Sequence, residues 1–322
     1  MTALRRLAWV TLVLAFGQVV FGAIVRITGS GMGCGDHWPQ CAGYWIPPLE
    51  RPDLIIEVTH RYIAAALSIA IVLLAALAFV RRRVPGVRGT GGVLRATLLA
   101  VVLVATAALF GAATVKLELT NKGVIVTHLA IAMTLLAVLV SCAMRAGGLG
   151  ASHASVGTAS ARTWRAARVA LGMTFVVLVM GAFTAHLPGA NSSCTGFPLC
   201  RGSLIPNATQ QVQFTHRILA FLLFFHLMGM AIAVHRRGEA RLITRAAAVA
   251  FAAVLAQIVV AAALVEMQLP PLFRSLHQAV GTLVWVAVVV LALLSRRGAL
   301  GVGVPANVTA PRPTLRAAEV AT

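Results

Sequence analysis

The stretch Tyr62-Ile-Ala-Ala-Ala-Leu-Ser-Ile-Ala-Ile-Val-Leu-Leu-Ala-Ala-Leu-Ala-Phe-Val80 decides the fold class. It carries no charged side chain and has about the length that crosses the hydrocarbon core of a bilayer as a helix. Seven more apolar runs follow this pattern, and the flanks of the shorter ones can extend them: Leu7–Val25, Ala96–Val115, Gly123–Met144, Val169–Ala185, Ile218–Val234, Ala246–Val265 and Ala279–Leu294. The sequence therefore predicts an all-α integral membrane protein with eight transmembrane helices.

The composition of the chain excludes an ordinary soluble globule. Of its 322 residues, 59% are hydrophobic and only 11% are charged, whereas about 25% charged residues is usual in soluble domains. No run alternates with period two, which argues against a membrane β-barrel. Arg5 and Arg6 precede the first run as in a signal peptide, but the run is longer than a usual signal core. We expect it to stay as a helix.

The net charge of +19 would fit a nucleic-acid partner if the charges formed one basic face. The arginines instead gather between alternate pairs of apolar runs, and 19 of the 27 basic residues fall on one side of an eight-helix chain. The positive-inside rule then places both termini in the cytoplasm. Membrane topology explains the charge, and we expect no nucleic-acid partner.

The two halves of the chain repeat a set of elements in the same order. Glu57-Val-Thr-His60-Arg61 matches Gln213-Phe-Thr-His216-Arg217, and each follows a glycine in the preceding run and a cysteine pair. His128 matches His277 further on. Since each unit would hold four helices, an even number, both units should have the same orientation in the membrane. We predict two parallel-repeat four-helix bundles.

The predicted domain boundaries follow from this repeat. Residues 1–145 form the first bundle and residues 164–297 the second. Residues 146–163 between them are rich in Gly, Ser and Ala, as in a cytoplasmic linker. Residues 298–322 carry three prolines among small residues and are predicted to be a disordered cytoplasmic tail.

Four of the nine histidines occupy equivalent places in the halves, each near the outer end of an even-numbered helix: His60, His128, His216 and His277. A single membrane histidine can simply hydrogen-bond to a neighbouring helix. Two imidazoles on facing helices of a four-helix bundle, however, suit the axial positions of a haem iron. Zinc usually takes three or four protein ligands. Two histidines in each half therefore favour haem over zinc.

Glu57 lies three residues before His60, on the same face if this extension is helical. A carboxylate near a helix start is also stabilised by the helix dipole. The matching residue is Gln213, which cannot exchange a proton, so only one half is equipped for acid–base chemistry. Arg61 and Arg217 adjoin ligand candidates and either pair with a haem propionate or mark the membrane interface.

Four cysteines form two closely spaced pairs in outer loops, Cys34 with Cys41 and Cys194 with Cys200. Disulfides are plausible on an oxidising side, whereas the spacing differs from that of zinc knuckles. A strained, redox-active bond is as well supported as a structural one. Cys142, inside the fourth apolar run, is expected to be an inert packing residue.

In combination, these motifs resemble haem A synthase, the membrane enzyme that oxidises a methyl group of haem O to a formyl group. The carriers of the resemblance are Gly29-Ser-Gly-Met-Gly-Cys34, Trp38-Pro-Gln-Cys41, Glu57-x-x-His60-Arg61, His128, Phe197-Pro-Leu-Cys200, His216-Arg217 and His277. They span roughly residues 5–297. The third outer loop departs from the pattern, because Ala185-His186-Leu-Pro-Gly-Ala-Asn replaces the Gly-Ser-Gly stretch.

The resemblance implies roles for these residues. His60 and His128 would bind the substrate haem O, and His216 and His277 would bind a haem b cofactor through its iron. Glu57 would take part in the oxidation, and Cys34 and Cys41 would form a disulfide, with a second between Cys194 and Cys200. A bacterial plasma membrane location is implied, with membrane lipid, a haem O synthase and a quinone or other electron acceptor as partners.

Two other classes of protein compete with this interpretation. A di-haem cytochrome b-type subunit that passes electrons from quinol would need two histidine pairs but no difference between Glu57 and Gln213. A haem or lipid transporter would place polar residues in broken helices at the membrane midplane, whereas here the polar groups lie near the outer ends of the helices.

Overall fold

The computed structural model describes residues 1–35, 39–89, 91–147, 157–200 and 207–300. Within these ranges, eight helices are long and apolar enough to cross a membrane. They are α1 (Thr2–Ile27), α2 (Pro52–Val80), α3 (Val93–Lys116), α4 (Lys122–Arg145), α5 (Ala161–His186), α6 (Ala208–Arg236), α7 (Arg241–Glu266) and α8 (Pro271–Ala299), with a short 3-10 helix at Ser30–Met32. The all-helical membrane fold predicted from the sequence is confirmed.

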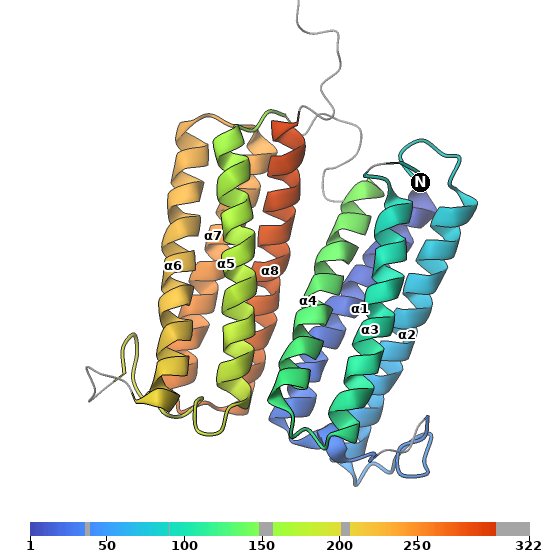
Figure 1. The fold of residues 1–322 in the computed structure, drawn as a ribbon, viewed down its shortest axis with the longest axis vertical. Helices are drawn as coiled ribbons and strands as arrows, with labels where there is room; N and C mark the ends of the chain where they lie inside the picture. Colours follow the sequence, from blue (N-terminus) through green and yellow to red (C-terminus); the bar gives the residue numbers. More distant parts are fainter. Residues whose placement is uncertain (36–38, 90, 148–156, 201–206, 301–322) are drawn as a thin grey trace, which may run out of the picture.

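The helices pack as two groups of four that stand side by side (Figure 1). In the first group each helix contacts the next and α1 closes the ring against α4, while α5 to α8 close a second ring in the same way. The start of α1 and the end of α8 lie at the same end of the molecule (Figure 1). This grouping agrees with the predicted pair of bundles. Half of the predicted linker, residues 148–156, and residues 301–322 of the predicted tail lie outside the described residues. The predicted boundaries are wrong by a few residues, because α5 begins at Ala161 inside the predicted linker and α8 continues to Ala299.

A tight turn with two successive left-handed residues connects α3 to α4, and another connects α7 to α8. Between α3 and α4, Glu118 and Leu119 have φ of 49° and 57°. Between α7 and α8, Gln268 and Leu269 have φ of 62° and 63°. Two successive left-handed residues without glycine are uncommon. Each group therefore contains such a turn between its third and fourth helices.

The seam between the groups is formed by α1, α4, α5 and α8. The indole Nε1 of Trp285 in α8 donates a hydrogen bond of 2.8 Å to the carbonyl of Met133 in α4. The Phe175 ring of α5 packs on the same indole, with 5.7 Å between ring centroids. Because a buried indole N–H needs an acceptor, this bond fixes how the second group sits against the first.

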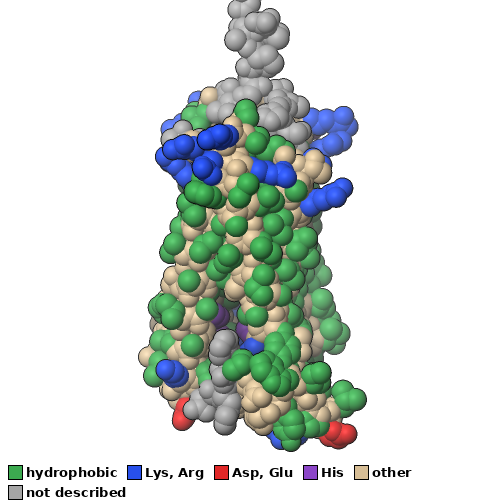
Figure 2. All heavy atoms as spheres, turned by 90° about the vertical axis from the view of Figure 1, so that its right-hand side faces the viewer, with side chains coloured by type: hydrophobic (Ala, Val, Ile, Leu, Met, Phe, Trp, Pro, Cys, Tyr) green, Lys and Arg blue, Asp and Glu red, His purple; other side chains and the backbone are tan. Residues whose placement is uncertain are grey.

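Charged residues separate along the molecule. Lys and Arg side chains gather at one end of the face in Figure 2, and acidic side chains appear at the other. We call the second end the outer end, because the unequal charge distribution predicts that it faces away from the cytoplasm. The loop with the first cysteine pair and the start of α2 lie at this end.

Candidate haem-binding sites

The first histidine pair lies between α2 and α4, near their outer ends. His60 and His128 are close enough for their charges to interact. A Cβ on Gly22 of α1 would come within 3.1 Å of His60 Nε2, and a Cβ on Gly111 of α3 would come within 3.3 Å of His128 Cε1. Both imidazoles therefore lie against backbone that only glycine leaves open. On the face formed by this group, histidine side chains are visible inside a hollow (Figure 2).

The second pair, His216 of α6 and His277 of α8, repeats this arrangement. The two side chains interact electrostatically. A Cβ on Gly181 of α5 would lie 3.0 Å from His216 Cε1. Gly181 is the residue that matches Gly22 in the repeat, so the same glycine makes room for an equivalent imidazole in each half. The structure thus brings together, two by two, the four histidines selected from the sequence.

A glutamine holds one histidine of each pair, and sequence reasoning did not find either one. The side-chain Nε2 of Gln18 in α1 lies 2.9 Å from His60 Nε2 and donates to the His60 carbonyl at 3.2 Å. The side-chain Nε2 of Gln257 in α7 lies 3.1 Å from His277 Nδ1 and donates to the His277 carbonyl at 3.0 Å. The backbone carbonyl of each histidine can only accept a hydrogen bond, so the glutamine atom beside it must be the side-chain nitrogen. The NH₂ group of each glutamine, and not its oxygen, therefore faces the imidazole ring.

The other histidine of each pair has a buried ring nitrogen without a well-formed hydrogen bond. Among the described residues, Nδ1 of His128 and Nδ1 of His216 are buried and have only the carbonyls of Ala107 and Val177 close by, without a hydrogen bond of good geometry. Buried polar atoms normally find a partner, so an orphaned atom calls for an explanation. Paired imidazoles that pack against glycine backbone, one of them without a well-formed hydrogen bond, have the donor chemistry that suits a haem with two axial histidines.

Glu57 is tied to the loop that carries the first cysteine pair. Its side chain is 5% exposed. One carboxylate oxygen accepts the backbone N–H of Cys34 at 2.8 Å, and the other accepts from Arg61 at 2.6 Å. Arg61 also donates to the Gly35 carbonyl at 3.0 Å. The predicted helical face shared by Glu57 and His60 is present, and the carboxylate links that helix to the loop.

The second half builds the same link without a carboxylate. Gln213 accepts the backbone N–H of Cys194 at 3.0 Å through its side-chain oxygen. Arg217 is buried and donates to the carbonyls of Cys194 and Gly196 at 2.8 Å and 2.7 Å. The guanidinium groups of Arg61 and Arg217 therefore bind loop carbonyls, and pairing with a haem propionate stays a prediction.

Both predicted cysteine pairs form disulfides, Cys34 with Cys41 and Cys194 with Cys200. Cys142 is free and buried, in agreement with a packing role. The Nε2 atom of His226 hydrogen-bonds to the Ala166 carbonyl at 3.0 Å. Part of each disulfide loop, residues 36–38 and 201–206, lies outside the described residues.

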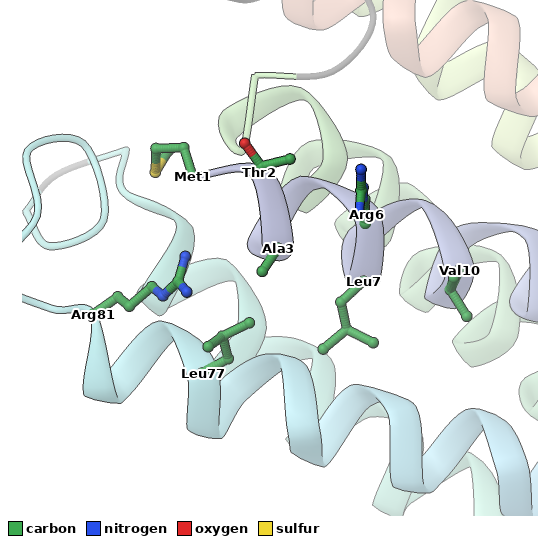
Figure 3. A pocket seen from close by; sticks show the side chains of 8 residues that line it. All are labelled: Met1, Thr2, Ala3, Arg6, Leu7, Val10, Leu77 and Arg81. Atoms are coloured by element: carbon green, nitrogen blue, oxygen red, sulfur yellow. The ribbon is translucent and has the colours of Figure 1, made fainter.

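A separate hollow lies at the opposite end of the first group, between the start of α1 and the end of α2 (Figure 3). Its wall is mostly aliphatic, with Arg6 and Arg81 at its edge and neither histidine nor carboxylate among its lining residues. It offers nothing that could ligate iron, so the histidine pairs remain the candidate sites.

Fold and site together define a class: a multi-helix membrane protein with a histidine pair, suited to haem, in each of two four-helix groups. Residues 5–289 match the model of the COX15-CtaA family, described as cytochrome oxidase assembly protein, and the chain belongs to this family. The chain is 32% identical to the haem A synthase of Symbiobacterium thermophilum, over 80% of this chain and 84% of that protein. It is 30% identical to that of Geobacillus kaustophilus, over 82% and 84% of the two chains.

Proposed function

We propose that this chain is a haem A synthase, which oxidises a methyl group on the porphyrin of haem O to a formyl group. The observation that carries the proposal is the presence of two histidine pairs in similar surroundings. Each pair has a glycine beside one imidazole and a disulfide loop nearby, but only the first has a carboxylate, Glu57, where the second has Gln213. The family match and the names of the relatives support the same reaction. The product would serve cytochrome c oxidase, in keeping with the family description.

The two sites take different parts in this proposal. His60 and His128 bind the iron of the substrate haem, since Glu57 lies one turn from His60. His216 and His277 bind a haem b cofactor, which supplies one-electron redox chemistry when bound. Residues 1–145 would then be the substrate bundle and residues 164–297 the cofactor bundle. The hollow in which histidine side chains are visible would let a lipid-soluble haem enter from the membrane (Figure 2).

Glu57 is proposed to handle protons or developing positive charge during the oxidation. The conversion of a methyl to a formyl group withdraws electrons and protons and adds an oxygen atom, so a proton acceptor close to the reacting carbon lowers the barrier. Arg61 keeps the carboxylate in place by its hydrogen bond. Electrons would pass to a quinone or other acceptor, and a haem O synthase would supply the substrate.

The proposal includes a topology. Both termini lie on the cytoplasmic side of a bacterial plasma membrane, because most basic residues gather at the end of the molecule where the chain starts (Figures 1 and 2). The disulfides would then face the oxidising side.

Pigment analysis of membranes from cells that supply haem O tests the function. We expect the wild type to contain haem A, and the His60→Ala and His128→Ala variants to keep haem b while haem A disappears. His235→Ala is the matched control, since His235 is exposed and lies outside both pairs. Wild-type membranes with haem b alone, and a quinol-linked electron transfer activity, would instead support the di-haem cytochrome b alternative.

A further inference from the structure

Four basic side chains lie at the outer end of the seam between the two groups. Arg26 is in the last turn of α1, Lys122 begins α4, His186 ends α5 and Arg274 is in the first turn of α8. These are the four helices through which the groups touch. The Arg26 guanidinium interacts electrostatically with Arg274, and His186 with both Arg26 and Lys122. We call these residues the outer basic cluster.

Among the described residues, no carboxylate interacts with Arg26 or His186. The Arg26 guanidinium is partly buried and makes no hydrogen bond or ion pair within that part of the chain. Lys122 donates to the Leu119 carbonyl at 3.1 Å, and His186 Nδ1 pairs with the Ala182 carbonyl at 2.8 Å. The like charges of Arg26 and Arg274 repel one another, so a bound anion would stabilise them.

An apolar groove leads from this cluster into the membrane. Its walls come mainly from α4, with Val126 and Ala130, and from α5, with Phe175, Val179 and Phe183, and its volume is about 450 Å³. At its outer end the groove reaches Gly123, next to Lys122, and Phe183, one helical turn before His186. The groove and the cluster are therefore continuous along the seam.

We propose that the seam binds an anionic phospholipid, with its phosphate between Arg26 and Lys122 and one acyl chain in the groove between α4 and α5. Charge complementarity selects the phosphate, because ammonium and guanidinium groups are strong phosphate partners. The groove selects a lipid over free phosphate, because its aliphatic and aromatic walls offer a place for a hydrocarbon chain. Helix ends at the membrane surface lie at the depth of the headgroups.

This lipid would join the two groups at the end where the histidine pairs lie. It would add a contact between the two groups to the hydrogen bond from Trp285 to Met133, which joins α8 and α4 further along the same helices. The site does not depend on the reaction proposed above, since neither histidine pair nor Glu57 contributes to it.

Native mass spectrometry of the purified full chain tests the proposal. After identical detergent washes we offer phosphatidylglycerol, phosphatidylcholine with the same acyl chains, or inorganic phosphate. The wild type should retain one phosphatidylglycerol at least tenfold more than phosphatidylcholine, and inorganic phosphate should not displace it. Arg26→Gln with Lys122→Gln should lower this retention at least tenfold. Arg162→Gln with Arg165→Gln, which removes the same charge from exposed positions at the other end of α5, should not.

A variant of the groove separates the acyl chain from the headgroup. Ala130→Trp fills the groove but leaves the cluster intact, and it should lower phosphatidylglycerol retention as well. Equal retention of the two lipids, or retention unchanged in Arg26→Gln with Lys122→Gln, would overturn the proposal. Displacement by inorganic phosphate would assign the cluster to a free anion. Loss of haem instead of lipid in the double variant would assign it to haem carboxylates, and either result also refutes the lipid site.

Discussion

Replacing Glu57 by Gln separates catalysis from loop anchoring, because the protein itself contains the control. In the second half, Gln213 already accepts the Cys194 N–H at 3.0 Å. A glutamine at position 57 can therefore keep the bond to the Cys34 N–H. What it loses is the charge in the bond to Arg61, which lies at 2.6 Å and is largely buried.

The structural cost of this change is limited. A hydrogen bond to a charged group contributes about 1.5–3 kcal/mol and a neutral one about 0.5–1.5 kcal/mol, so the variant should lose about 1–2 kcal/mol of stability. A protein with a total stability of about 5–15 kcal/mol remains folded after such a loss. General acid–base catalysis, in contrast, contributes about 10²–10⁴-fold in rate. The two roles therefore predict activities that differ widely.

The assay measures haem A formation per molecule of protein that retains haem b, in membranes supplied with haem O. We expect Glu57→Gln to lower this rate at least 100-fold, to accumulate haem O or a hydroxylated intermediate, and to unfold at a slightly lower temperature. Glu57→Ala, which also leaves the Cys34 N–H unpaired, should lose more stability. A Glu57→Gln rate within threefold of the wild type would refute a catalytic role and favour the electron-carrier class.

Three further predictions test the sites and the scaffold. His216→Ala and His277→Ala should each abolish a low-spin haem b spectrum, because a bis-imidazole iron cannot stay six-coordinate without both ligands; a spectrum retained in both variants would disprove the assignment. Gln18→Leu frees His60 Nε2 of a competing bond that contributes about 1 kcal/mol, so the purified protein should bind haem O about fivefold more tightly; an unchanged dissociation constant speaks against competition. Burial raises the pKa of Glu239, but hydrogen bonds from Thr163 and other groups hold it below the ordinary value. The resulting stabilisation is present above the ordinary pKa and is lost as pH falls through the folded-state pKa, so thermal unfolding of Glu239→Gln should depend less on pH between 7 and 3 than that of the wild type.

Hydropathy located every transmembrane helix but not where each one ends. The run Tyr62–Val80 extends in the structure to Pro52, and Leu7–Val25 extends to Thr2 and Ile27. Polar residues continue a helix through the headgroup region, where hydropathy no longer marks it, because the backbone still gains from hydrogen bonding. The sequence left open whether the segment that carries Glu57 is helical, and the structure places it in α2.

The repeat identified the four histidines and the difference between Glu57 and Gln213, but it did not select the two glutamines that contact the histidines. Gln18 and Gln257 have no counterpart of their own kind, so comparison of the halves passed over them. The sequence did offer a reason to select both glutamines, because a polar amide inside an apolar membrane run is energetically costly and usually has a function. Which side of a helix faces a histidine depends on packing, and hydropathy does not specify it.

The glutamines show how the two halves have diverged around a common scaffold. Gln18 lies four residues before Gly22, and Val177 occupies the same place before Gly181. Gln257 lies nine residues before the end of α7, and Ala107 occupies that place in α3. Both halves keep the glycine, the disulfide and the anchored loop. The glutamine, however, contacts the first histidine of the pair, His60, in one half and the second histidine, His277, in the other.

This divergence bears on the division of work between the sites. In the first half the amide lies on His60 Nε2 at 2.9 Å, and in the second it lies nearer Nδ1 of His277, at 3.1 Å against 3.4 Å for Nε2. A nitrogen that is occupied by an amide must be released before it can bind iron, which suits a haem that arrives and leaves. A bond to the other ring nitrogen orients a ligand without competing for it, which suits a haem that stays. The glutamines thus support the same assignment as Glu57, with substrate in the first half and cofactor in the second.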